Sequence, residues 1–202
     1  APRLPGSHLQ CHAPIQMDQP LPPGLYIVAT PIGNLGDMTS RAAETLRRAD
    51  LILAEDKRVT AKLLAHVGAK APMMAYHDHS DGNLRDRILA DLATKAVALV
   101  SDAGTPLISD PGYKLVRAAR QAGLAVHTQP GPSALIAALT LAGLPTDRFL
   151  FLGFLPAKTK ARAEVIAEAA SIRATLVLYE SGPRLGESLA ALRDGLGDGE
   201  VA

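Results

Sequence analysis

The chain has 202 residues, which is enough for one large domain or two modest ones. Hydrophobic residues make up 48% of it and aromatic residues only 3%, so we expect a core built mainly of Ala, Val, Leu and Ile. The 21 basic and 20 acidic residues nearly cancel. This balance excludes the general basic excess that is typical of nucleic-acid-binding proteins, so any affinity for RNA would depend on local patches.

The sequence lacks the features of several other classes of protein. Its single cysteine, Cys11, excludes an intramolecular disulfide, and no Cys/His spacing predicts a metal site. No apolar run reaches the ~18 residues of a membrane helix. Residues 1–24 hold six prolines without periodicity, which predicts a flexible leader, and they lack the charged-then-apolar order of a signal peptide. We therefore expect a cytoplasmic protein.

Regular elements are predicted from Leu25 onward. The first part of the chain predicts a strand at 25–30, a helix near 40–48 with Asp37 or Thr39 as its cap, a strand at 51–55, a helix ending at Gly68 and a strand at 72–77. The middle predicts a helix with Leu84, Ile88, Leu89 and Leu92 on one face, a strand at 96–101, a helix between Gly112 and Gly123 and a strand at 124–129. The last part predicts a helix with Pro132 in its first turn, strands at 149–154 and 175–180, and helices at 158–170 and from Pro183.

This alternation of strands and helices predicts an α/β fold with mostly parallel sheets covered on both faces. We place a domain boundary near Pro145–Arg148, which gives an N-terminal α/β domain at 25–145 and a partial C-terminal α/β domain at 146–202. The second block has only two strands, and two strands rarely form a stable sheet alone. We therefore expect the second domain to be truncated at Ala202.

Four polar loops rich in Gly or Pro follow predicted strands, where ligands gather in open parallel sheets. They are PIGNLGDMT (31–39), SDAGTPLISDPG (101–112), QPGPSA (129–134) and GFLPAKTK (153–160). Each could be an ordinary turn, but four together indicate a ligand site. No dinucleotide-binding, P-loop or nucleophile-elbow motif is present.

Seven blocks of sequence carry a resemblance to a known family. In order they are LYIVATPIGNLGDMTSRA, LILAEDKR, HDHS, ALVSDAGTPLISDPGYKLV, PGPSALIAAL, LAGLPTDRFLFLGFLPAK and LYESGPR. With these blocks, the chain from Leu25 to Arg184 resembles the ribosomal RNA small-subunit methyltransferase I family, a branch of the tetrapyrrole methylases. The resemblance implies a class III methyltransferase with S-adenosylmethionine in a cleft between two α/β domains. It also implies a homodimer that methylates the ribose 2′-hydroxyl of a decoding-centre cytidine in the 16S RNA of the small ribosomal subunit.

The resemblance also implies which residues hold the cofactor. They are Pro31 after the first strand, Asp102 and Thr105 in SDAGTP, Ser133 and Ala134 in PGPSA, and Phe154 and Leu155 in GFLP. Two departures stand out. Lys57 occupies a position where relatives usually carry Thr, and the family continues beyond Ala202 with further strands.

Transfer of a methyl group to a hydroxyl needs a base or hydrogen-bond acceptor beside the nucleophile. Glu55 and Asp56 follow one strand and His77 follows the next, so we name these three as catalytic candidates. A solvated turn and an ordinary loop histidine are the alternatives, and His77 with His79 as a metal pair is the least favoured.

Four basic residues are candidates for contacts with RNA: Lys57, Arg58, Lys158 and Lys160. Exposed turns and helix starts account for them equally well. Two other functions stay open for the chain as a whole. They are carbon methylation of a tetrapyrrole, which shares the fold, and a non-catalytic cofactor-binding module.

Overall fold

The computed structural model describes residues 19–77 and 82–202, so Cys11 and His79 lie outside the described residues. Its first sheet has five parallel strands in the order β3-β2-β4-β1-β5. Their bounds are β1 Gly24–Val28, β2 Leu51–Ala54, β3 Met73–Ala75, β4 Ala96–Val100 and β5 Val126–Gln129. The predicted α/β class with parallel strands is confirmed.

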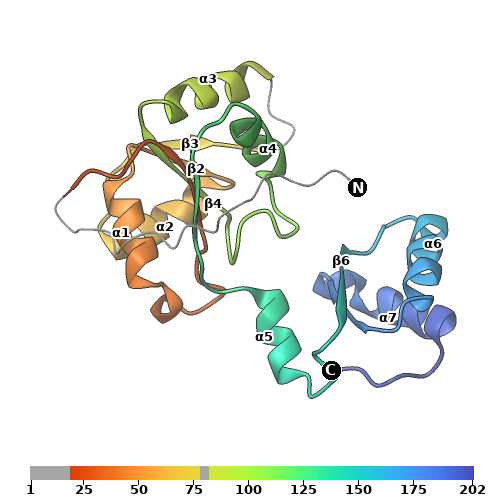
Figure 1. The fold of residues 1–202 in the computed structure, drawn as a ribbon. Helices are drawn as coiled ribbons and strands as arrows, with labels where there is room; N and C mark the ends of the chain where they lie inside the picture. Colours follow the sequence, from red (N-terminus) through yellow and green to blue (C-terminus); the bar gives the residue numbers. More distant parts are fainter. Residues whose placement is uncertain (1–18, 78–81) are drawn as a thin grey trace.

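Helices cover both faces of this sheet (Figure 1). Helices α1 (Ser40–Arg48) and α2 (Lys57–Val67) pack on one face, where Leu46 and Leu64 meet Val28 and Ile52. Helices α3 (Gly82–Leu92) and α4 (Tyr113–Gln121) pack on the other face. The central strands are buried on both sides, which is why they read as continuous apolar runs instead of alternating.

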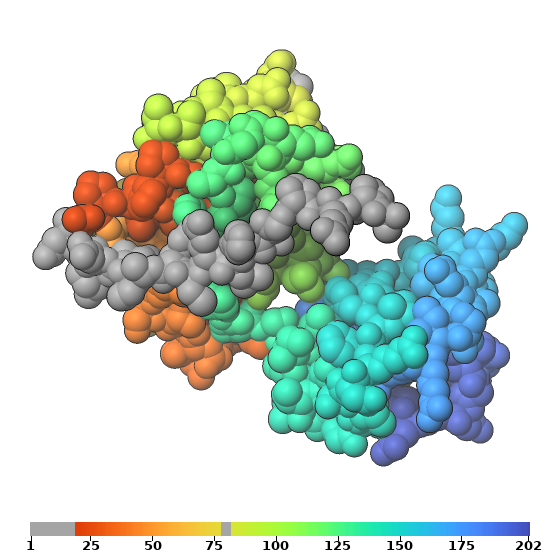
Figure 2. Space-filling view, in the orientation of Figure 1, coloured from red at the N-terminus to blue at the C-terminus, as the bar shows by residue number. Residues whose placement is uncertain are grey.

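The second sheet pairs β6 (Phe149–Phe154) with β7 (Thr175–Tyr179) in parallel, beside α6 (Thr159–Ala170) and α7 (Gly182–Leu196). Figures 1 and 2 show it in cyan and blue, set apart from the first sheet. Helix α5 (Ala134–Leu141) precedes the proposed boundary at 145–148, yet its Leu135 and Leu139 pack against Val177 of β7. The division of the chain into 25–145 and 146–202 stays a proposal. No helix in the described ranges is long and apolar enough to cross a membrane.

Most predicted helix ends agree with the structure. Gly68 ends α2 in the left-handed conformation with φ 72°, and the Thr39 side chain accepts a hydrogen bond from the N–H of Ala42 as the cap of α1. Asp37 was a wrong candidate for that cap, because it lies in a short 3-10 turn (Leu35–Asp37). The placement of Pro132 in the first turn of a helix was also wrong, since α5 begins at Ala134 after the cap residue Ser133.

The order of the strands places the topological switch point of the sheet between β1 and β4. The chain leaves β1 towards β2 by way of α1, and it leaves β4 towards β5 by way of α4 on the opposite face. Neighbouring strands whose connections diverge in this way leave an opening at their carboxyl ends, which is where ligands bind in α/β sheets. Strand β1 ends at Val28, earlier than predicted, because Thr30 forms an isolated antiparallel bridge with Gly104 beyond β4.

Substitution of Gly112, at the start of α4, is a test of how tightly the loop after β4 is packed. Gly112 has φ 130°, and a Cβ there would lie 2.7 Å from Cδ2 of Leu99. We expect Gly112→Ala to lower the free energy of unfolding by about 2–4 kcal/mol, because backbone strain adds to overpacking. The matched control is Gly68→Ala, where φ is also positive but the space is open, and we expect a cost of about 1 kcal/mol. If urea denaturation shows that the two variants lose the same free energy of unfolding, this account is contradicted.

Candidate active site

Acidic side chains gather where β2 and β4 end. The backbone N–H of Asp56 donates a hydrogen bond to Oδ1 of Asp102 over 3.0 Å. The backbone of Asp102 in turn lies close enough to the Glu55 carboxylate to lower its pKa. The bond from Asp56 to Asp102 ties the loop after β2 to the loop after β4. It brings together Glu55 and Asp102, which sequence analysis had assigned to catalysis and to the cofactor.

The environment makes Glu55 a weaker acid than an ordinary glutamate. Partial burial raises its pKa, and the neighbouring charges of Asp110 and Asp102 raise it further, while the Asp102 N–H and His77 act in the opposite direction. Burial also raises the pKa of Asp110, while the nearby Ser101 hydroxyl acts in the opposite direction. A carboxyl group with a raised pKa at the carboxyl edge of a sheet has the properties of a general base.

The carboxylate of Asp56 is occupied by local contacts. It accepts a hydrogen bond from the backbone N–H of Arg58 as the cap of α2, and it pairs with the Arg58 guanidinium at 2.7 Å. The Arg58 bonds lower the pKa of Asp56 to about 2, which favours Glu55 over Asp56 as a proton acceptor. His77 is exposed after β3 and lies within electrostatic reach of Glu55, and Lys57 is exposed at the start of α2.

The loop at 101–112 has an unusual backbone. Leu107 and Ser109 both have positive φ, at 74° and 64°, although neither is glycine. Such conformations cost about 1–3 kcal/mol each and concentrate at functional sites. The loop is also bonded to two others, through the paired backbones of Thr30 and Gly104 and through the Thr105 hydroxyl, which donates to the Pro132 carbonyl at 2.9 Å. Pro31 follows this bridge, half-buried.

The loop at 129–134 lies against the end of β1. A Cβ on Gly131 would lie 3.0 Å from that of Ala29, so the loop and the strand approach closely. Ser133 caps α5 without a side-chain hydrogen bond, and Ala134 is exposed beside it. The side-chain oxygen of Gln129, at the end of β5, is buried without a partner among the described residues.

The loop after β6 is held by the second sheet's own helix. The Arg184 guanidinium donates to the Leu155 carbonyl at 2.6 Å and also pairs with Glu180 at 3.5 Å. Leu155 is 1% exposed, whereas Phe154 is 53% exposed and packs edge-on to Tyr179. The ordering of this loop explains the LYESGPR block, which supplies Tyr179, Glu180 and Arg184.

Contacts between the two sheets converge on these loops. The Tyr179 hydroxyl of β7 accepts a hydrogen bond from the N–H of Leu135 at the start of α5. A Cβ on Gly153 would lie 3.1 Å from Oγ of Ser109, so the end of β6 lies against the loop after β4. The predicted segments at 129–134 and 153–160 therefore each contact the loop at 101–112. The loop at 31–39 joins them through the residues that precede it.

Lys158 and Lys160 lie apart from the acidic cluster, exposed at the start of α6, where Lys158 is the cap residue. Sequence analysis did not single out Asp110, Gln129 or Arg184. All three were visible in the sequence as members of the loops or the LYESGPR block. The signal for their roles was absent, because only the fold shows what each side chain contacts.

Comparison with known proteins agrees with this architecture. Residues 24–202 match the model of the tetrapyrrole (corrin/porphyrin) methylases. A solved structure of diphthine synthase superposes with a TM-score of 0.66 at 20% identity, covering 85% of this chain and 71% of that one. The fold and its loops thus define a tetrapyrrole-methylase-type protein of class III, as predicted.

Two curated relatives are more similar in sequence. The ribosomal RNA small subunit methyltransferase I of Erythrobacter litoralis is 60% identical over 184 residues, which cover 91% of this chain and 66% of that protein. The protein of the same name from Xylella fastidiosa is 52% identical over 182 residues, covering 90% and 67%. The chain therefore belongs to the ribosomal RNA small subunit methyltransferase I family of the tetrapyrrole methylases. It spans about two thirds of the length of these relatives.

Proposed function

We propose that this chain methylates the ribose 2′-hydroxyl of a decoding-centre cytidine in 16S ribosomal RNA, with S-adenosylmethionine as the methyl donor. The observation that carries the proposal is the position of the Glu55 carboxylate, which lies at the carboxyl edge of the sheet in the loop that is bonded to Asp102, where burial and the neighbouring carboxylates raise its pKa. A ribose hydroxyl is a weak nucleophile, and a positioned carboxylate can accept its proton. The names and identities of the relatives support RNA methylation as the broader activity.

The residues at the carboxyl ends of β2, β4 and β5 fit a sulfonium cofactor. The cluster of Glu55, Asp102 and Asp110 is a negative environment that suits a positive group. The unpartnered side-chain oxygen of Gln129 is a buried acceptor at the end of β5. S-adenosylmethionine would supply an electrophilic methyl group here.

Within this proposal each loop has a task. The Asp102 carboxylate, the backbone near Pro31 and Thr105, the half-buried Ser133 and the exposed Ala134 would bind the cofactor. Phe154 and Leu155 would close the cleft from the second sheet, where Arg184 orders their loop. Glu55 would accept the proton of the ribose hydroxyl, and His77 would tune the charge of Glu55.

The RNA and a second copy of the chain are the proposed partners. Lys57, Arg58, Lys158 and Lys160 remain proposed RNA contacts, of which Arg58 is engaged by Asp56. The acidic cluster disfavours a carboxylate-rich tetrapyrrole as the substrate, since like charges repel at close range. A non-catalytic cofactor-binding module does not require a base with a raised pKa.

The substrate chemistry can be tested on small ribosomal subunits that lack the modification. We expect nucleoside mass spectrometry after incubation with the chain and S-adenosylmethionine to find 2′-O-methylcytidine. Subunits reconstituted with 2′-deoxycytidine at the modified position should accept no methyl group, because the nucleophile is absent. A 2′-deoxycytidine elsewhere in the RNA is the matched control and should leave transfer unchanged. Methylation of the deoxy substrate, or of neither substrate, would contradict the proposal.

A further inference from the structure

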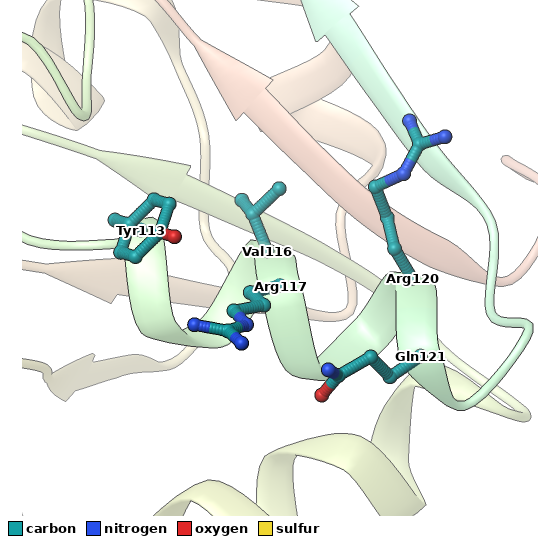
Figure 3. Close-up of a pocket in the computed structure, with 5 residues that line it drawn as sticks. All are labelled: Tyr113, Val116, Arg117, Arg120 and Gln121. Atoms are coloured by element: carbon teal, nitrogen blue, oxygen red, sulfur yellow. The ribbon is translucent and has the colours of Figure 1, made fainter. Parts of the chain in front are cut away.

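The outer side of α4 combines cationic and aromatic side chains in one stripe. Tyr113, Val116, Arg117, Arg120 and Gln121 follow the spacing i, i+3, i+4, i+7 and i+8, which places them on one side of a helix. The buried residues Leu115 and Ala119 face the sheet on the opposite side. The five side chains of the stripe line a surface hollow of about 380 Å³ (Figure 3).

The charge of this stripe comes from Arg117 and Arg120. Helix α4 has no acidic residue, and none occurs in the chain between Asp110 and Asp147. Among the described residues, neither Arg117 nor Arg120 forms an ion pair.

Helix α3, which packs beside α4, also carries acidic groups. Asp91 of α3 already pairs with Lys95 at 2.7 Å, and Asp86 lies between Arg85 and Arg87 in the sequence. In a chain whose formal net charge is only +1, the stripe is therefore a local cationic surface.

The stripe begins beside the acidic cluster. Tyr113 follows Asp110 by three residues, and its ring is 59% exposed. An exposed ring provides a surface on which a nucleic acid base stacks, whatever its identity. Arg117 and Arg120 lie about 4.5 Å apart along the helix axis, given a rise of about 1.5 Å per residue, and guanidinium groups bind phosphates well.

We propose that this stripe binds the single-stranded RNA that carries the methylated ribose. The base of a neighbouring nucleotide stacks on Tyr113, while Arg117 and Arg120 bind the phosphates that follow it. The cations also hold these phosphates away from the carboxylates of the cluster, where charge repulsion would oppose binding. This inference rests on the proposed function and adds the surface that orients its substrate.

The test measures binding of the chain to an unstructured 15-nucleotide RNA of adenosine and cytidine by fluorescence anisotropy at several salt concentrations. We expect Arg117→Glu/Arg120→Glu to weaken binding about tenfold or more at low salt. The slope of log affinity against log salt should fall by about 1.4, since each phosphate contact on a single strand contributes about 0.7. We expect Tyr113→Ala to weaken binding about tenfold and Tyr113→Phe to retain it, because stacking needs only the ring.

The matched control is Lys62→Glu/Lys70→Glu, which changes the charge equally at exposed positions on and after α2. This control should keep most of the affinity for RNA and an unchanged slope of log affinity against log salt. The inference is overturned if the stripe variants bind as the unaltered chain does, if the control loses as much, or if the unaltered chain does not bind. It is also overturned if the stripe variants separate a dimer but leave RNA binding intact, which would make α4 an interface between copies. If the stripe variants bind RNA normally and still methylate ribosomal subunits, this inference fails but the proposed function is unaffected.

Discussion

Glu55→Gln is expected to reduce the rate of methyl transfer by about 10²–10⁴-fold, the usual contribution of a positioned general base. Glutamine keeps the shape and an acceptor oxygen of the side chain but cannot take up a proton. In the unaltered chain the rate should fall as the pH drops through the raised pKa of Glu55, because protonation removes the base. The variant should lack this acidic limb, and initial rates from pH 5 to 9 measure both effects.

Loss of the fold would not produce this pattern. Because the pKa of Glu55 is higher in the folded than in the unfolded chain, its ionised form opposes folding at pH values above both pKa values. Glu55→Gln should therefore be at least as stable as the unaltered chain at neutral pH. Glu164→Gln on the exposed side of α6 is the matched control and should change neither rate nor pH profile. A normal rate in the Glu55 variant would assign the base elsewhere, with His77 the next candidate to test.

Asp102→Ala is expected to weaken the binding of S-adenosylmethionine by about 1.5–3 kcal/mol, or about 10- to 150-fold, because a charge-assisted hydrogen bond is lost. Titration calorimetry measures the affinity directly. The structure adds a complication, since Oδ1 of Asp102 also accepts the N–H of Asp56. Asp102→Asn keeps an acceptor for that N–H while removing the charge. It therefore separates binding of the cofactor from support of the loop after β2.

Two outcomes distinguish these roles. If both variants lose affinity, the charge of Asp102 acts on the cofactor. If only Asp102→Ala does so, the residue acts through the backbone of Asp56. Asp86→Asn, an exposed carboxylate on α3, is the matched control. Unchanged affinity in both variants, with normal circular dichroism, would remove Asp102 from the site.

In the two proposals together, the acidic cluster and the α4 stripe have separate roles in one site. Catalysis on a ribose requires a base close to the hydroxyl, but the same negative charge repels the phosphates on either side of it. Placing Glu55 and Asp102 at the ends of strands, and Arg117 and Arg120 along the helix that follows, separates the two requirements in space. The helix begins three residues after Asp110, so only a short segment of the chain connects the acidic cluster to the stripe.

The α/β class, most element bounds and the loop positions followed from the sequence by itself. Short apolar runs such as 96–100 are typical of strands buried on both faces, and Gly68 and Thr39 have the chemistry that ends and begins helices. These properties are local, so neighbouring residues contain the information. The errors were local as well. Asp37 and Pro132 fit the preferences for a cap and a first turn, but other residues took those positions.

Only the tertiary structure decided how the candidates combine. Sequence spacing placed Glu55 and Asp102 after different strands, and the order β2-β4-β1 made them neighbours. The same packing gave Glu55 its raised pKa, whereas Asp56, the next residue, became a cap paired with Arg58. Burial, charge and hydrogen bonding at a site depend on residues distant in the chain. No local pattern of amino acids can specify them, and here the fold did so by joining the ends of separate strands.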